Sequence, residues 1–177
     1  GLRVGSVADH PANDGEIAVH RITGPFRETG PNEFEVRLEK GLGENLKRYE
    51  LWFAAVSPGN AVFKPAVQQA EMVIPVKQTA GVTQRIDFPV LADQMEGKEP
   101  VALQAVSDAG LPVHYFVQEG PAFIEGDSLL HVTPIPVHSR YPVKVTVVAW
   151  QWGRSTEPAV QTADMVTRNF LIYKKEK

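Results

Sequence analysis

Two tryptophans at the end of one apolar segment are the residues of this chain best suited to binding chemistry. In VKVTVVAWQWG, residues 143–153, strict alternation places Trp150 and Trp152 on the same side as Lys144 and Thr146. Because the polar pair marks this side as solvent-facing, two exposed indole rings would form a flat apolar platform. Sugar rings stack on such platforms, so the pattern predicts a candidate carbohydrate site. The alternative is that a strand twist or bulge buries one or both rings, since tryptophan is highly buried on average.

The histidines lack the spacing of metal ligands. His20 and His114 fall at similar places in an internal repeat, which indicates a shared structural role. Neither an H-x-x-x-H nor an H-E-x-x-H pair occurs, so no metal site is predicted. The five histidines are His10, His20, His114, His131 and His138.

Acidic residues and nucleophiles give no catalytic pattern either. The acidic residues of the loops lie beside glycines, where turn formation accounts for them without a calcium site. These residues are Asp93, Asp108, Glu125 and Asp127. No G-x-S-x-G motif and no phosphate-binding glycine loop is present. We therefore expect no enzyme activity and no cofactor.

The composition excludes several classes of protein. The 177 residues include 18 basic and 21 acidic residues, a net charge of −3, and no long basic run, so the sequence lacks the footprint of a nucleic-acid-binding protein. No cysteine is present, which excludes disulfides and zinc–thiolate sites. No apolar stretch approaches the roughly 18 residues that span a bilayer.

The elements that must position these residues are short strands. Fourteen glycines and fourteen prolines interrupt the chain and leave little room for long helices. Between them apolar and polar residues alternate, as in residues 33–39 and 143–147. Residues 66–73 also favour an extended strand, because valines and flanking prolines outweigh the helix-forming residues. Many short strands predict a sandwich or a barrel.

An internal repeat divides the chain. Residues 65–73 read PAVQQAEMV and residues 158–166 read PAVQTADMV, with seven of nine positions identical. Similar landmarks precede both copies at offsets of 93–96 residues. We therefore predict an all-β fold of two tandem immunoglobulin-like β-sandwich domains related by internal duplication, over residues 1–78 and 82–177. The first copy is shorter, so either residues 2–7 supply its leading edge or upstream residues are missing.

The second half resembles the immunoglobulin-like repeats of large secreted and surface proteins of bacteria. The resemblance rests on QRIDF at residues 84–88, on VALQAVSDAGLPVHYFVQEGPA at 101–122 and on residues 143–172, and it is weak over 17–76. It implies a location that is secreted, periplasmic or at the cell surface. Within that fold Tyr115, Phe116, Phe123 and Phe170 are expected to fill the core.

These observations favour a non-catalytic accessory or spacer module of an exported bacterial protein. It would position neighbouring domains or mediate protein interaction, with no nucleic acid and no membrane span. The rival hypothesis is a carbohydrate-binding module in which Trp150 and Trp152 bind polysaccharide. An enzyme, such as a glycosidase, ranks last, because nothing gathers acidic residues in a cleft.

Overall fold

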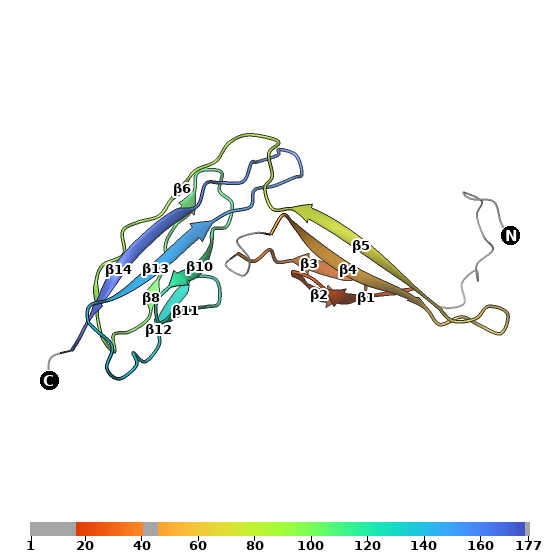
Figure 1. Ribbon diagram of the computed structural model, residues 1–177. Coiled ribbons are helices and arrows are strands. Elements are labelled where there is room, and N and C mark those ends of the chain that lie inside the picture. Colours follow the sequence, from red (N-terminus) through yellow and green to blue (C-terminus); the bar gives the residue numbers. More distant parts are fainter. Residues whose placement is uncertain (1–16, 41–45, 176–177) are drawn as a thin grey trace. The chain divides into compact units, whose positions relative to one another are not determined.

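The computed structural model describes residues 17–40 and 46–175 of the chain (Figure 1). Its described residues form strands and no helix, which confirms the predicted all-β class. The described residues divide into two compact units: unit 1 holds residues 17–39 and 46–75, and unit 2 holds Lys40 and residues 76–175. Within the described part, no helix is long and apolar enough to cross a membrane.

Unit 1 combines a three-stranded sheet with a hairpin. The sheet has the order β1-β4-β5 and the hairpin pairs β2 with β3. The strands are β1 (Ala18–Thr23), β2 (Phe26–Gly30), β3 (Glu33–Val36), β4 (Arg48–Ser57) and β5 (Ala66–Pro75). The rings of Phe26, Phe34 and Phe53 lie 4.6–5.6 Å apart, and the side chain of Leu51 is fully buried. This aromatic cluster joins the hairpin to the sheet.

Unit 2 is the larger sandwich. Its main sheet has the order β10-β13-β14-β7, a second sheet the order β11-β12-β8, and β6 pairs with β9. The strands are β6 (Ile86–Asp87), β7 (Gln94–Met95), β8 (Val101–Ala102), β9 (Val106–Ser107), β10 (His114–Glu119), β11 (Ala122–Glu125), β12 (Leu129–Val132), β13 (Val143–Trp150) and β14 (Val166–Tyr173). Figure 1 shows β13 and β14 side by side in this sheet.

The core of unit 2 lies between its sheets. Its largest fully buried side chains each contribute about 1.5–3 kcal/mol of burial free energy. They are Phe88, Leu130, Ile172, Val145 and Val147. The core-facing side chains of β13 and β14 are mostly β-branched or aromatic, which favours strands that pack on that face: Val143, Val145 and Val147 in β13, and Val166, Phe170 and Ile172 in β14.

The predicted aromatic core of unit 2 is only partly correct. Phe170 is buried and Tyr115 packs against the core. Phe123 is instead 49 % exposed and stacks on the His131 ring, with centroids 5.0 Å apart. Phe116 is half-buried outside the core cluster, because adjacent residues of a strand point to opposite faces and Tyr115 occupies the inner one.

The two units repeat one strand plan, which confirms the predicted duplication. The β1-β4-β5 sheet with its β2–β3 hairpin corresponds to the β10-β13-β14 sheet with its β11–β12 hairpin. A bulge interrupts the β1–β4 pairing between Arg21 and Thr23, and another interrupts the β10–β13 pairing between Val117 and Glu119. Described residues of unit 1 contain no counterparts of β6 to β9.

Equivalent glycines turn the chain before each hairpin. Gly24 has φ +122° and Gly120 has φ +103°, backbone conformations that favour glycine. A Cβ on Gly24 would lie 2.5 Å from the Glu50 carbonyl oxygen, and one on Gly120 would lie 2.6 Å from that of Lys144. The close approach of the corner to the central strand therefore excludes any side chain at both places.

Strand register corrects the equivalence of two histidines. In unit 1 the bulge of β1 ends at Thr23, and His20, three residues earlier, pairs with Ala54. In unit 2 the bulge of β10 ends at Glu119, and the residue three positions earlier is Phe116, which pairs with Val148. His114 lies two residues earlier in β10. The two imidazoles thus share no structural position, because the sequence offset between β1 and β10 is 96 residues rather than 94.

The nine-residue repeat adopts two conformations. Residues 66–73 belong to β5, where Gln68 pairs with Ala55, as the extended prediction required. Residues 158–165 form a loop, and β14 begins only at Val166. Since Ala55 and Ala149 are equivalent in register, Gln68 corresponds to Val166 and not to Gln161. The two copies of the repeat therefore occupy positions that differ by five residues when the two units are aligned by strand register.

Candidate functional site: the connector and its clamp segment

The first residues of unit 2 after β5 are bonded to a loop of the same unit. We define the connector as residues 76–84 and the clamp segment as residues 158–163. The Val82 amide donates to the Ala159 carbonyl at 3.0 Å, and the Gln161 amide donates to the Val82 carbonyl at 2.8 Å. Val82 and Val160 thereby form a parallel bridge. The connector is thus paired to unit 2 as a short strand would be.

Side chains of the clamp segment extend this pairing along the connector. The Gln78 amide donates to Thr162 Oγ1 at 2.7 Å, and the Thr162 amide donates to the Gln78 carbonyl at 2.9 Å. Gln161 Nε2 donates to the Gly81 carbonyl at 2.9 Å, and Gln84 Nε2 donates to the Gln161 carbonyl at 2.7 Å. Only Val76 and Lys77 lie between the end of β5 and the first bonded residue.

Backbone contact at Gly81 shows how closely the two segments approach. Gly81 has φ +93°, and a Cβ there would lie 2.1 Å from the Ala159 carbonyl oxygen. Ala159 and Val160 of the clamp segment are both buried. Backbone-to-backbone packing therefore requires glycine at residue 81.

The clamp segment is itself held from its other side. The Val160 amide donates to the Arg154 carbonyl and the Arg154 amide donates to the Val160 carbonyl, both at 2.9 Å. Arg154 also donates from its guanidinium to the Pro158 carbonyl, at 2.7 and 2.9 Å. Thr162 Oγ1 donates to the Trp152 carbonyl. The connector, the clamp segment and the end of β13 therefore form one hydrogen-bonded layer.

Buried glutamines carry much of this layer, and the sequence analysis did not single them out. Gln151 is 5 % exposed; its Oε1 accepts from the Gly153 amide at 2.6 Å and its Nε2 donates to the Pro112 carbonyl. Gln84 is 6 % exposed, and its Oε1 accepts from Ser107 Oγ at 2.6 Å. The sequence analysis included Gln84 and Gln151 only as parts of longer motifs, because glutamine is usually exposed and its sequence position alone does not indicate burial.

The tryptophans do not form the expected platform. On this face of β13 Lys144 is exposed as predicted, but Thr146, Val148 and Trp150 are buried, with exposed fractions of 6 %, 2 % and 3 %. The predicted exposure of Trp150 is therefore wrong, and the alternative of a buried ring holds. On this face Lys40 Nζ lies over the Trp150 ring, 5.9 Å from its centroid, and Glu119 accepts from Thr146. The His114 ring lies 5.4 Å from the Trp150 ring. Trp152 follows the end of β13 and is half-buried.

An ion pair closes the start of this face. Lys144 Nζ lies 2.7 Å from Glu119 Oε2, which also accepts from Thr146 Oγ1 at 3.2 Å. The hydrogen bond from Lys144 lowers the pKa of the Glu119 carboxyl, and that from Thr146 adds to this effect. The polar residues that suggested exposure therefore bond across the strands.

The remaining sequence candidates form no common centre. His131 Nε2 lies 2.8 Å from Glu125 Oε2, Asp93 accepts from the Leu171 amide, and Asp108 accepts from the Arg85 amide. The last two are the turn and edge contacts expected of loop carboxylates. Over residues 17–40 and 46–175, no group of three or more histidines or carboxylates could hold a metal ion. His10 lies outside the described residues.

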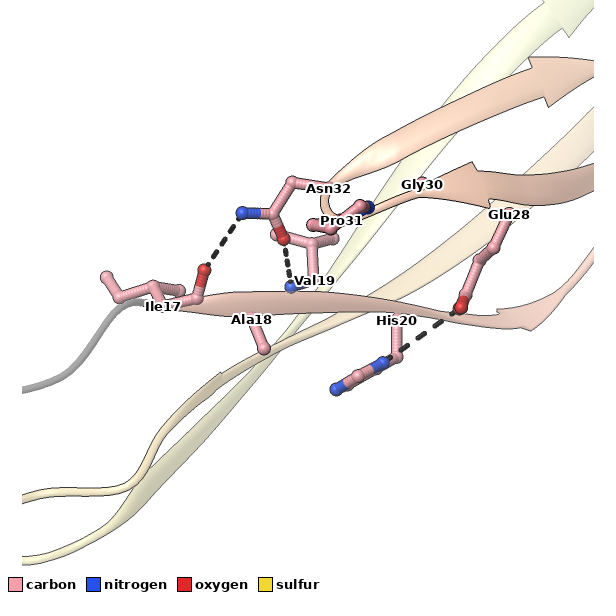
Figure 2. Close-up of a pocket in the computed structure, with 8 residues that line it drawn as sticks. All are labelled: Ile17, Ala18, Val19, His20, Glu28, Gly30, Pro31 and Asn32. Carbon is pink, nitrogen blue, oxygen red and sulfur yellow. Dashed lines mark hydrogen bonds and ion pairs between the residues drawn. The ribbon is translucent and has the colours of Figure 1, made fainter.

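A pocket of about 360 Å³ lies in unit 1 (Figure 2). It lies between β1 and the β2–β3 hairpin, and His20 Nδ1 is 4.0 Å from Glu28 Oε1 within it. Asn32 Oδ1 accepts from the Val19 amide at 2.7 Å, and Glu28 Oε1 accepts from the Arg21 amide at 2.6 Å. The polar side chains of the pocket are thus engaged with the backbone of β1.

Comparisons with known proteins identify no family. No family model matches the chain, and no curated protein matches it. Among solved structures, human protocadherin-24 EC1-2 has a TM-score of 0.39 and 11 % identity, over 94 % of this chain and 85 % of that one. Mouse protocadherin-24 EC1-3 has a TM-score of 0.38 and 15 % identity, over 98 % and 65 %. Drosophila N-cadherin EC1-4 has a TM-score of 0.35 and 14 % identity, over 92 % and 42 %. At these values they assign neither a family nor an activity.

Proposed function

We propose that the chain is a non-catalytic spacer module that holds neighbouring parts of a larger exported bacterial protein at a set separation. The observation that carries the proposal is the bonded connector. A flexible linker leaves its backbone groups to water, whereas Gln78, Gly81 and Val82 are bonded to the clamp segment. A tether whose free part is Val76 and Lys77 limits the arrangements open to two domains.

The resemblance to bacterial immunoglobulin-like repeats supports the same proposal. Such repeats serve as stalks and accessory modules, and the duplicated strand plan is what a chain of spacers requires. Fold likeness alone does not transfer function, so the proposal depends on the connector.

Measuring the freedom between the units tests the proposal. The chain has no cysteine, so spin labels can be placed on Val62→Cys in unit 1 and Val137→Cys in unit 2, at sites 81 % and 84 % exposed. Pulsed dipolar spectroscopy of this doubly labelled chain is expected to give a narrow distance distribution.

A matched control inserts a flexible Gly-Ser segment between Val76 and Lys77, which leaves the clamp contacts of Gln78 intact. The distribution should then broaden markedly. If the unmodified chain gives a distribution as broad as the insertion variant, the units are not held at a set separation and the proposal is refuted.

A further inference from the structure

The core-facing side of β5 is open in the part of unit 1 that the structure describes. Leu51 of β4 is fully buried, and Met72 of β5 lies opposite it on the same face of the sheet. Met72 is nevertheless 47 % exposed, and Ala70, the next residue of β5 on this face, is exposed as well. The described residues of unit 1 thus leave an apolar part of its core side in contact with solvent.

The equivalent side of β14 in unit 2 is closed. There Phe170 pairs with Val145, the residue of β13 that is equivalent to Leu51 of β4. Phe170 is therefore the counterpart of Met72, and it is only 3 % exposed. The same strand plan places a side chain in the core of unit 2 and leaves its counterpart exposed in unit 1.

A segment that precedes β10 lies against this side of unit 2. Ile86 and Phe88 belong to the same buried core cluster as Phe170, whereas Asp87 between them is exposed. Arg168 of β14 donates from its guanidinium Nε to the Phe88 carbonyl at 2.7 Å. An extended segment with the order apolar, polar, apolar therefore closes the core side of β14.

The sequence of unit 1 has a segment of the same kind before β1. Leu2 and Val4 flank Arg3, which repeats the order of residues 86–88. These three residues lie outside the described part of the chain. Their pattern alone matches what the core side of β5 requires, because alternate residues of a strand point to the same side.

The chain before β1 is long enough to bring this segment to β5. Ala18 at the start of β1 lies level with Val67 of β5, since both pair with Val56. From Ala18, Met72 lies two strands across and a few residues along the sheet, a distance of about 20 Å. Residues 8–16 span up to about 30 Å when extended. The segment before them can therefore lie on the core side of β5.

We propose that residues 2–7 are the leading strand of unit 1 and close its core, with Val4 over Ala70 and Met72. Val4 then takes the place that Phe88 has in unit 2. The occupant comes from the same chain because unit 2 is closed by its own leading segment. A tether of this length also keeps residues 2–7 at a high local concentration near β5, which favours them over a separate molecule.

Oxidation by hydrogen peroxide tests whether Met72 is covered. Met72 and Met95 are 47 % and 46 % exposed among the described residues, so without a covering segment they should form sulfoxide at similar rates. Burial of one aliphatic side chain favours a docked segment by about tenfold, so Met72 should react at least about threefold more slowly than Met95. Peptide mass spectrometry of the full chain measures both rates.

Serine substitutions identify the residues that protect Met72. The double variant Leu2→Ser/Val4→Ser should raise the oxidation rate of Met72 to that of Met95, because it removes the apolar side of the segment. Arg3→Ser is the matched control and should leave Met72 protected, since its side chain points away from the core. Circular dichroism checks that both variants keep the β-sheet spectrum.

A disulfide test locates the segment directly. In this cysteine-free chain, Val4→Cys with Met72→Cys should form an intramolecular disulfide faster than Arg3→Cys with Met72→Cys. Equal rates for the two pairs overturn the proposal, as does equal oxidation of Met72 and Met95 in the unmodified chain. Protection of Met72 that survives Leu2→Ser/Val4→Ser also overturns it. So does protection that increases with protein concentration, because a second copy would then be the occupant.

Discussion

Replacing Thr162 with valine should loosen the connector from unit 2. Valine keeps the shape of threonine and removes Oγ1, which accepts from the Gln78 amide at 2.7 Å and donates to the Trp152 carbonyl. The site is half-buried, so neither group regains full hydration. Leaving such groups without a partner costs about 1–3 kcal/mol. Because water reaches part of the site, we expect a loss of about 1–2 kcal/mol in the free energy that holds the connector.

Proteolysis measures this loss directly. Lys77 is exposed and directly precedes Gln78, so trypsin can cleave there only when the connector leaves the clamp segment. A loss of about 1–2 kcal/mol raises the population of the open form roughly 5- to 30-fold. Cleavage after Lys77, followed by mass spectrometry under conditions where opening is faster than cleavage, should accelerate by that factor.

The matched control is Thr79→Val, the same change at an exposed residue of the connector itself. It should leave the rate of cleavage after Lys77 within a factor of about two, as surface changes usually stay within ±0.5 kcal/mol. Equal cleavage rates for Thr162→Val and Thr79→Val would refute the reasoning, since the hydroxyl of Thr162 would then not hold the connector.

Three further changes test the sandwich of unit 2. Both Gly120→Ala and Gly126→Ala should lower the free energy of unfolding by about 1–2 kcal/mol, because both glycines have positive φ. Gly120→Ala should lower it clearly more in urea unfolding, because only a Cβ at residue 120 would lie against a carbonyl oxygen. Trp150→Ala should cost about 3–5 kcal/mol by calorimetry, and a loss below about 1 kcal/mol would show that the ring is exposed in solution. Because the pKa of Glu119 is lowered in the folded state, its contribution is present above the usual glutamate pKa and is lost as the pH falls through the folded value. The urea midpoint of Glu119→Gln should therefore depend less on pH over the acid range than that of the unchanged chain.

Much of the fold could be predicted because it depends on local pattern. Alternation in residues 143–147 indicated β13, and the prolines around residues 66–73 indicated β5. The glycines and prolines that interrupt the chain indicated short strands, and Gly120 and Gly24 are two glycines whose backbone angles only glycine accepts at no steric cost. The strand order of both units confirms the predicted duplication, although the two copies of the nine-residue repeat lie at different places in that strand order.

The candidate site could not be predicted in the same way. Alternation correctly separated the two faces of β13, yet it could not tell that the face with Trp150 is also covered. That depends on Lys40 and His114, which lie far from Trp150 in the sequence and reach its ring only after folding. Gln84 and Gln161 became important through their bonds to each other and to Gly81, across about 80 residues of chain.

The sequence by itself determined which segments can be extended, where the chain turns, and that one unit occurs twice. The tertiary structure alone decided what PAVQ does: in unit 1 it pairs with β4, and in unit 2 it holds the connector. Identical residues have identical local preferences, which amount to a few tenths of a kcal/mol per residue. Backbone hydrogen bonds to distant partners outweigh those preferences, so the partner that each copy meets sets its conformation.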